Sequence, residues 1–117
     1  YLFKGEIKTL LFIPDIDKWS KWNISIDSLV KTVDYALLDG TFYGQSELPN
    51  RDMSEVPHPF VSESMDQWEK WDAIQKAKVY FIHFNHSNPL LNRQSEEFVN
   101  VLKKGFNIAE TGMSFKL

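Results

Sequence analysis

The sequence predicts an α/β fold in which a mixed sheet is flanked by helices. Apolar segments of strand length alternate with segments whose apolar residues repeat at helical spacing, which is typical of layered α/β domains with parallel strand pairs. Residues 79–91 show the pattern clearly, because the apolar run from Val79 to Ile82 stops at His83 and a turn follows at Asn88 and Pro89. With 117 residues, 43% of them hydrophobic, the chain can form one domain with a modest core and is not a disordered segment.

Six segments have the composition of β-strands. They cover residues 1–4, 7–13, 35–38, 79–82, 106–110 and 113–117. The first two flank a turn around Gly5, and the second ends at Pro14, which cannot continue a ladder. The last two flank Thr111-Gly112, so that a hairpin is expected at the C-terminal end.

Three helices are expected between these strands, which gives the order β-β-α-β-α-β-α-β-β. Ser25 and Ser95 are expected N-caps, Pro59 stands where the second helix can start, and Gly105 ends the third. Their apolar faces are Ile26, Leu29, Val30 and Val33, then Val61, Met65 and Trp68, then Phe98, Val101 and Leu102. Trp68 and Trp71 are expected to belong to the core. Residues 40–57 show neither pattern and form a long connection of the kind that often carries function.

Composition argues against several classes of protein and site. The formal net charge is −3, and no basic cluster exceeds Lys103-Lys104, which disfavours a nucleic-acid partner. Cysteine is absent, so a metal site would use nitrogen and oxygen ligands. No apolar run approaches the roughly 20 residues of a membrane span, so no membrane association is expected. The chain starts without Met, and we expect it to be part of a longer protein, which leaves a cytoplasmic, periplasmic or secreted location open.

Residues that can bind metal or move protons follow three of the expected strands. Asp15, Asp39 and His83 each stand at the end of an apolar run, and His58 lies between two prolines that restrict its backbone. In open α/β sheets, ligands gather beyond the carboxyl ends of the strands. If these strands are parallel neighbours, the four side chains converge at one edge of the sheet.

The chemistry of this set suits a divalent metal ion. Zn²⁺ and Fe²⁺ accept imidazole together with carboxylate, so Asp15 and His83 are candidate ligands. A carboxylate beside a histidine fixes its tautomer and raises its basicity, so Asp39 and His58 are a candidate proton-handling pair. Ordinary interpretations stay open: an Asp after a strand is often a turn former, His83 can be a hydrogen-bonded core residue, and His86 can be a surface loop residue. None of the spacings is a compact metal motif.

The segments LLFIPDID, YALLDGTFY, ELPNRDMSEVPHPFVSESM and VYFIHFNHSNPLL, in this order, resemble the C-terminal half of a metallo-β-lactamase-fold protein. The nearest group is the pyrroloquinoline-quinone biosynthesis protein B-like proteins, and the resemblance covers nearly the whole chain. It implies that Asp15 matches the late metal-bridging aspartate and His83 the last histidine ligand. Asp39 and His58 resemble the acid–histidine pair of RNase Z-type enzymes. Zn²⁺ is the implied metal, with Fe²⁺ or Mn²⁺ as alternatives.

The main metal motif of that fold, H-x-H-x-D-H, is absent from this chain. We therefore expect residues 1–117 to be one partial domain, one half of an αβ/βα sandwich, which alone does not catalyse and which needs the N-terminal half as partner. A sheet face left without its partner sheet exposes apolar surface, so self-association is also expected.

Three functions follow as hypotheses. In the first, the chain is part of a metal-dependent hydrolase that acts on a small molecule through a metal-activated water. In the second, it is part of an iron-dependent oxidative enzyme of quinone cofactor biosynthesis. In the third, it is a non-catalytic α/β binding or assembly module whose strand-end acids are only caps. An RNase Z-like nuclease is disfavoured by the acidic balance.

Overall fold

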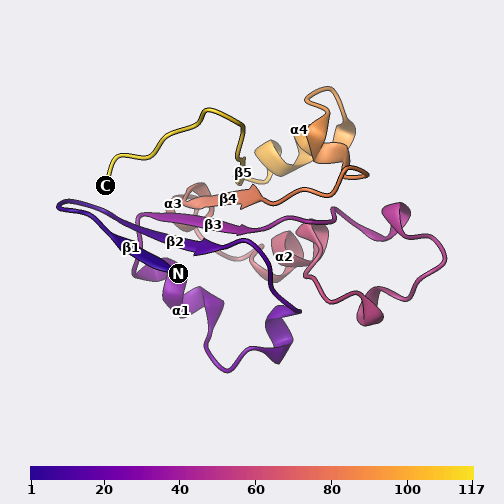
Figure 1. The fold of residues 1–117 in the computed structure, drawn as a ribbon, viewed down its shortest axis with the longest axis horizontal. Helices are drawn as coiled ribbons and strands as arrows, with labels where there is room; N and C mark the ends of the chain where they lie inside the picture. Colours follow the sequence, from indigo (N-terminus) through magenta and orange to yellow (C-terminus); the bar gives the residue numbers. More distant parts are fainter.

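A five-stranded mixed sheet forms the centre of the molecule in a computed structural model that describes all 117 residues (Figure 1). The strands are β1 (Leu2–Lys4), β2 (Thr9–Ile13), β3 (Tyr35–Asp39), β4 (Val79–Ile82) and β5 (Asn107–Ile108). They lie in the order β1-β2-β3-β4-β5; β1 pairs with β2 antiparallel, and every other pair is parallel. The expected α/β class with parallel pairing is confirmed.

Four short α-helices connect the strands, and none of them is both long and apolar enough to cross a bilayer. They are α1 (Ile26–Lys31), α2 (Val61–Gln67), α3 (Ala73–Ala77) and α4 (Glu96–Lys103). The predicted caps are present, because the hydroxyl of Ser25 accepts from Ser28 N and that of Ser95 accepts from Phe98 N. Helix α3, which begins after the N-cap Asp72, was not predicted.

The connection from residue 40 to residue 57 contains no strand and no α-helix, as expected. Its regular structure is limited to two 3₁₀ turns, Gln45–Glu47 and Met53–Glu55. A third 3₁₀ turn, Trp19–Lys21, follows β2, and a fourth, Pro89–Leu91, follows β4.

One face of the sheet packs against the helices and forms the core. Successive strand residues point to opposite faces, so every second residue of β2, β3 and β4 lies on this side. The core contains the strand residues Leu11, Ile13, Ala36, Leu38, Val79, Phe81 and Ile108 and the helix residues Ile26, Val30, Val61, Met65 and Val101. The apolar helix stripes predicted from the sequence therefore have a sheet face to cover, except that Leu102, which was expected on the last stripe, is 49% exposed.

The four tryptophans form a continuous chain of rings on this helical side. Trp19 lies 5.4 Å from Trp22 and 5.7 Å from Trp68 between ring centroids, and Trp68 stacks on Trp71 at 4.8 Å. Trp68 is fully buried and Trp71 packs against the core, which confirms both as core residues. Trp19 Nε1 also donates to Ser64 Oγ at 2.9 Å, so the loop after β2 is joined to α2.

The opposite face of the sheet is covered in part by the C-terminal segment. The ring of Phe115 lies 5.0 Å from the rings of both Tyr35 and Tyr80, measured between centroids. The carbonyl of Leu117 accepts from Ile7 N at 2.8 Å and from Lys8 N at 2.7 Å. The final segment therefore crosses the sheet toward the turn that joins β1 and β2.

The predicted hairpin at residues 106–117 is wrong. Only Asn107–Ile108 forms a strand, which pairs with β4, and no strand follows Gly112. The turn itself exists, since Gly112 has a φ of 90° and Met113 N donates to Glu110 O. Contact of Phe115 with two distant tyrosines replaces the local pairing. The strand predicted from residue 7 also starts later, at Thr9, because Ile7 lies in the exposed turn.

Candidate metal and proton-transfer site

Three neighbouring parallel strands end at the same edge of the sheet. The strand register pairs Ile13 with Leu38 and Asp39 with Ile82, so β2, β3 and β4 end side by side and their arrowheads in Figure 1 point the same way. Asp15 therefore follows β2, Asp39 ends β3 and His83 follows β4 along one edge. The adjacency that the sequence predicted for these strand ends is present in the structure.

Asp39 is the most enclosed polar side chain of this edge, with no exposed surface. Its Oδ1 accepts from Thr41 N at 2.8 Å and from Thr41 Oγ1 at 2.7 Å. Its Oδ2 accepts from Ile16 N at 3.0 Å and lies 2.9 Å from His58 Nδ1. Burial of a carboxylate is costly unless donors surround it, and here each oxygen has two. Asp39 thus connects the loop after β2, the turn after β3 and the segment before α2.

His58 contacts Asp39 directly, although 19 residues separate them. Its side chain is 18% exposed, and its ring meets the ring of Phe42 edge-on at 5.8 Å between centroids. The same Nδ1 lies 3.6 Å from Asp15 Oδ1. The two residues that the sequence paired are therefore hydrogen-bonded, and their role in proton transfer stays a prediction.

Asp15 is the open carboxylate of the site. Its side chain is 69% exposed, and its ligand atoms form a group with those of Asp39 and His58 in which all lie within 4.8 Å of one another. Proximity alone would make these three residues a metal-binding set. However, both oxygens of Asp39 and Nδ1 of His58 are already engaged in hydrogen bonds. Within this group, the atoms outside those hydrogen bonds are the Asp15 carboxylate, which can bind a metal ion, and Nε2 of His58, which can bind a metal ion or exchange a proton.

The loop that carries Asp15 is fixed to α2 at two further points. Lys18 Nζ donates to both oxygens of Glu63 at 2.9 Å and 3.0 Å and lies 4.3 Å from the centre of the Phe60 ring. Trp19 is bonded to Ser64, as described above. Since His58 lies just before α2, these contacts hold the loop of Asp15 and the segment of His58 in one arrangement.

His83 lies outside that group but joins the same network. It is the one non-glycine residue with a positive φ, 63°, a conformation in which histidine is more common than most residues. His83 follows β4 directly, and the next turn of the chain lies at residues 86–87. Nδ1 of His83 lies 3.0 Å from Thr41 Oγ1, and Thr41 in turn contacts Asp39. His86 is exposed and its ring makes no hydrogen bond, so its role stays open.

The sequence did not predict the parts played by Thr41, Asn88 and Gly40. Asn88 is buried, and its Nδ2 donates to Gly40 O at 2.7 Å and Thr41 O at 3.2 Å. A Cβ at Gly40 would lie only 3.0 Å from Phe81 Cβ, so glycine allows β3 and β4 to approach closely. Thr41 and Asn88 do stand in the motifs DGTF and HSNP, and an Asn before Pro is a recognised cap signal, which was the available clue.

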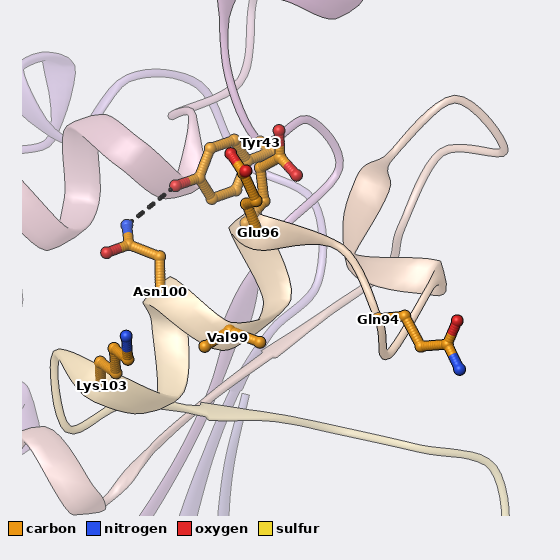
Figure 2. Close-up of a pocket in the computed structure, with 7 residues that line it drawn as sticks. Tyr43, Gln94, Glu96, Val99, Asn100 and Lys103 are labelled. Carbon is orange, nitrogen blue, oxygen red and sulfur yellow. Dashed lines mark hydrogen bonds between the residues drawn. The ribbon is translucent and has the colours of Figure 1, made fainter.

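A surface hollow of about 550 Å³ lies away from these residues, beside α4. Figure 2 shows Glu96, Val99, Asn100 and Lys103 of this helix around it, with Tyr43 from the long connection. Asn100 Nδ2 donates to the Tyr43 hydroxyl at 3.1 Å, which joins the connection to α4. None of the four candidate site residues lines this hollow.

No family model matches the sequence, but individual proteins do. Coenzyme PQQ synthesis protein B of Gluconobacter oxydans is 30% identical over 115 residues, which are 94% of this chain and 37% of that protein. The protein of the same name from Acinetobacter baumannii is 24% identical over 115 residues, again 94% of this chain and 37% of that protein. In Pseudomonas putida the identity is 28% over 95 residues, 77% of this chain and 31% of that protein. The chain is homologous to coenzyme PQQ synthesis protein B.

The fold of this chain is also similar to that of a solved protein structure. Zn²⁺-bound PqqB from Methylobacterium extorquens superposes with a TM-score of 0.76 at 19% identity, over 99% of this chain and 42% of that one. The mixed sheet with flanking helices is accordingly part of a metallo-β-lactamase fold, as the sequence predicted. The chain spans about a third of the length of the PQQ synthesis protein B relatives that it matches.

Proposed function

We propose that this chain provides part of the active site of a metal-dependent enzyme in PQQ synthesis. One observation carries the proposal: the free carboxylate of Asp15, the Asp39–His58 pair and His83 gather at the carboxyl ends of three adjacent parallel strands. Asp15 and His83 are the metal ligands in this proposal. The relatives' name and the Zn²⁺ in the solved PqqB support it.

The donor set fits a divalent metal ion. It contains the exposed carboxylate of Asp15 and the imidazole of His83, whose Nδ1 already contacts Thr41, which is the usual arrangement of a metal-binding histidine. A bound divalent ion supplies a Lewis acid that polarises a substrate oxygen and acidifies water. Zn²⁺ suits these ligands best, and Fe²⁺ or Mn²⁺ are alternatives.

The residues of this chain would handle the proton. His58 is oriented by the buried Asp39, and its free Nε2 can take a proton from a reacting group or return it. We favour hydrolysis of a small molecule over iron-dependent oxidation as the reaction. A catalytic metal needs at least three protein ligands, so the chain alone is expected to be inactive without residues from the remaining part of the relatives' length.

Metal analysis of the full polypeptide that carries this sequence tests the proposal. We expect Asp15→Ala and His83→Ala to lower the bound metal clearly. Asp17→Ala and His86→Ala are matched controls on the same two loops, and both should keep it. If both site variants retain the metal content of the unaltered protein, the site assignment is wrong.

A second candidate function is a non-catalytic binding or assembly module. It is favoured by the complete hydrogen bonding of Asp39, which would suffice to explain this residue as a structural cross-link. In that case the full polypeptide would bind no stoichiometric metal, and the effect of Asp39→Asn would be a loss of stability alone.

A further inference from the structure

We propose that Thr41 holds the ring of His83 in the tautomer that carries its proton on Nδ1, and that it thereby presents Nε2 of His83 to the metal ion. The inference rests on the proposed function for the metal, but the tautomer itself can be measured without one.

The argument begins with the single hydroxyl proton of Thr41. Oγ1 lies 2.7 Å from Asp39 Oδ1 and 3.0 Å from His83 Nδ1. Asp39 already receives three other donors from Thr41 N, Ile16 N and His58, so its carboxyl group acts as an acceptor on every side. The hydroxyl therefore donates to Asp39. Its lone pairs face His83, and Nδ1 of His83 must be the donor in that contact.

The position of the hydroxyl is fixed by the backbone around it. Thr41 is buried, its N donates to Asp39, and its carbonyl accepts from Asn85 N at 2.9 Å and from Asn88 Nδ2 at 3.2 Å. The ring of His83, by contrast, is exposed and makes no other hydrogen bond. Thr41 is thus the one group that selects which ring nitrogen carries the proton.

The two histidines are bonded to opposite oxygens of the same carboxylate. His58 reaches Oδ2 directly at 2.9 Å, whereas His83 reaches Oδ1 through the Thr41 hydroxyl. Both rings are therefore held through Nδ1, and a proton on Nδ1 of His83 leaves the lone pair of its Nε2 available as a ligand. Thr41 is a positioning residue in this scheme.

The test uses Thr41→Val, which keeps the size but removes the hydroxyl, and Thr41→Ser, which keeps the hydroxyl. Ring ¹⁵N chemical shifts in the metal-free full polypeptide report the tautomer, and with three histidines in this sequence a His83→Gln variant assigns the signal. We expect the Nδ1–H form in the unaltered protein and in Thr41→Ser, and its loss in Thr41→Val. Zn²⁺ affinity should fall about 10–100-fold in Thr41→Val and stay near normal in Thr41→Ser.

Thr9→Val is the matched control, because Thr9 makes the corresponding contacts to Asp34 at the other end of β3. It should change neither the shifts nor the affinity. An Nε2–H ring in the unaltered protein would overturn the inference even if Thr41→Val failed to fold. Unchanged shifts in a folded Thr41→Val would also overturn it. An Nδ1–H ring in a full polypeptide that binds no metal would sustain the tautomer assignment and overturn the proposed function instead.

Discussion

The two ends of β3 carry the same pair of residue types in two different environments. At the start of the strand, Asp34 accepts from Thr9 N at 2.8 Å and from Thr9 Oγ1 at 3.3 Å, and it is exposed to solvent. At its end, Asp39 accepts from Thr41 N and Thr41 Oγ1 and also contacts Ile16 N and His58, with no exposure. The contact of Asp34 with Thr9 is thus a solvent-exposed pair, whereas the contact of Asp39 with Thr41 is the centre of a buried hydrogen-bond network. Burial and the additional partners, rather than the residue types, make the second edge a candidate site.

The largest effect should come from Asp39→Asn. The amide keeps the shape of the side chain but turns an NH₂ group toward two donors, so buried groups lose their acceptor. We expect a loss of about 3 kcal/mol in the free energy of unfolding, measured by urea denaturation of the full polypeptide. Asp34→Asn should cost less than about 0.5 kcal/mol, because water replaces the lost contact. Equal losses in the two variants would contradict the comparison.

Asn88→Ala should be the next most damaging change. It removes two hydrogen bonds to the carbonyls of Gly40 and Thr41 and a third, in which Oδ1 accepts from Leu90 N at 2.9 Å, all in buried surroundings. The expected loss of stability is about 2 kcal/mol. The control is Asn92→Ala, which removes one exposed contact to Gln94 N and should cost less than about 0.5 kcal/mol. A small loss for Asn88→Ala would mean that the site turn is held by other groups.

His83→Gly should separate stability from metal binding. Glycine adopts a positive φ without strain, which offsets the lost hydrogen bond to Thr41, so the free energy of unfolding of the metal-free protein should change by less than about 1 kcal/mol. Zn²⁺ affinity, measured by competition with a chelator, should fall at least about 10-fold. His86→Ala should leave both quantities unchanged. Normal Zn²⁺ affinity in His83→Gly would remove His83 from the proposed ligands.

The smallest effect should come from Asp17, an exposed carboxylate two residues beyond Asp15. The backbone N–H of Lys18, and next the side chain of Lys21, lower the pKa of Asp17 below its usual 3.8. Because the pKa is lower in the folded state, the stabilisation is present above pH 3.8 and is lost as the pH falls through the folded pKa. The melting temperature of Asp17→Asn should therefore lie slightly below that of the unaltered protein at neutral pH, and the two should converge in acid. A difference that persists in acid would require another cause.

Patterns local to a few residues could be predicted from the sequence. The apolar runs at residues 35–38 and 79–82 placed two strands, and with them the edge at which Asp39 and His83 meet. Ser25 and Ser95 marked two helix starts, because a cap depends only on neighbouring residues. What depends on distant contacts could not be predicted. The prediction of a C-terminal hairpin was wrong because Phe115 packs on Tyr35 and Tyr80 instead. The role of Thr41 depends on Asp39, two positions away in the sequence, and on His83, 42 positions away.

The unbroken contact of the four indole rings has a practical consequence for spectroscopy. Excitation energy absorbed by any one of Trp19, Trp22, Trp68 and Trp71 can pass to the others, so the intrinsic fluorescence of this chain reports the packing between the sheet and its helices as one signal. Separation of the helices from the sheet would change the tryptophan emission spectrum. A change confined to the side chains of His58 and His83 would need a separate probe.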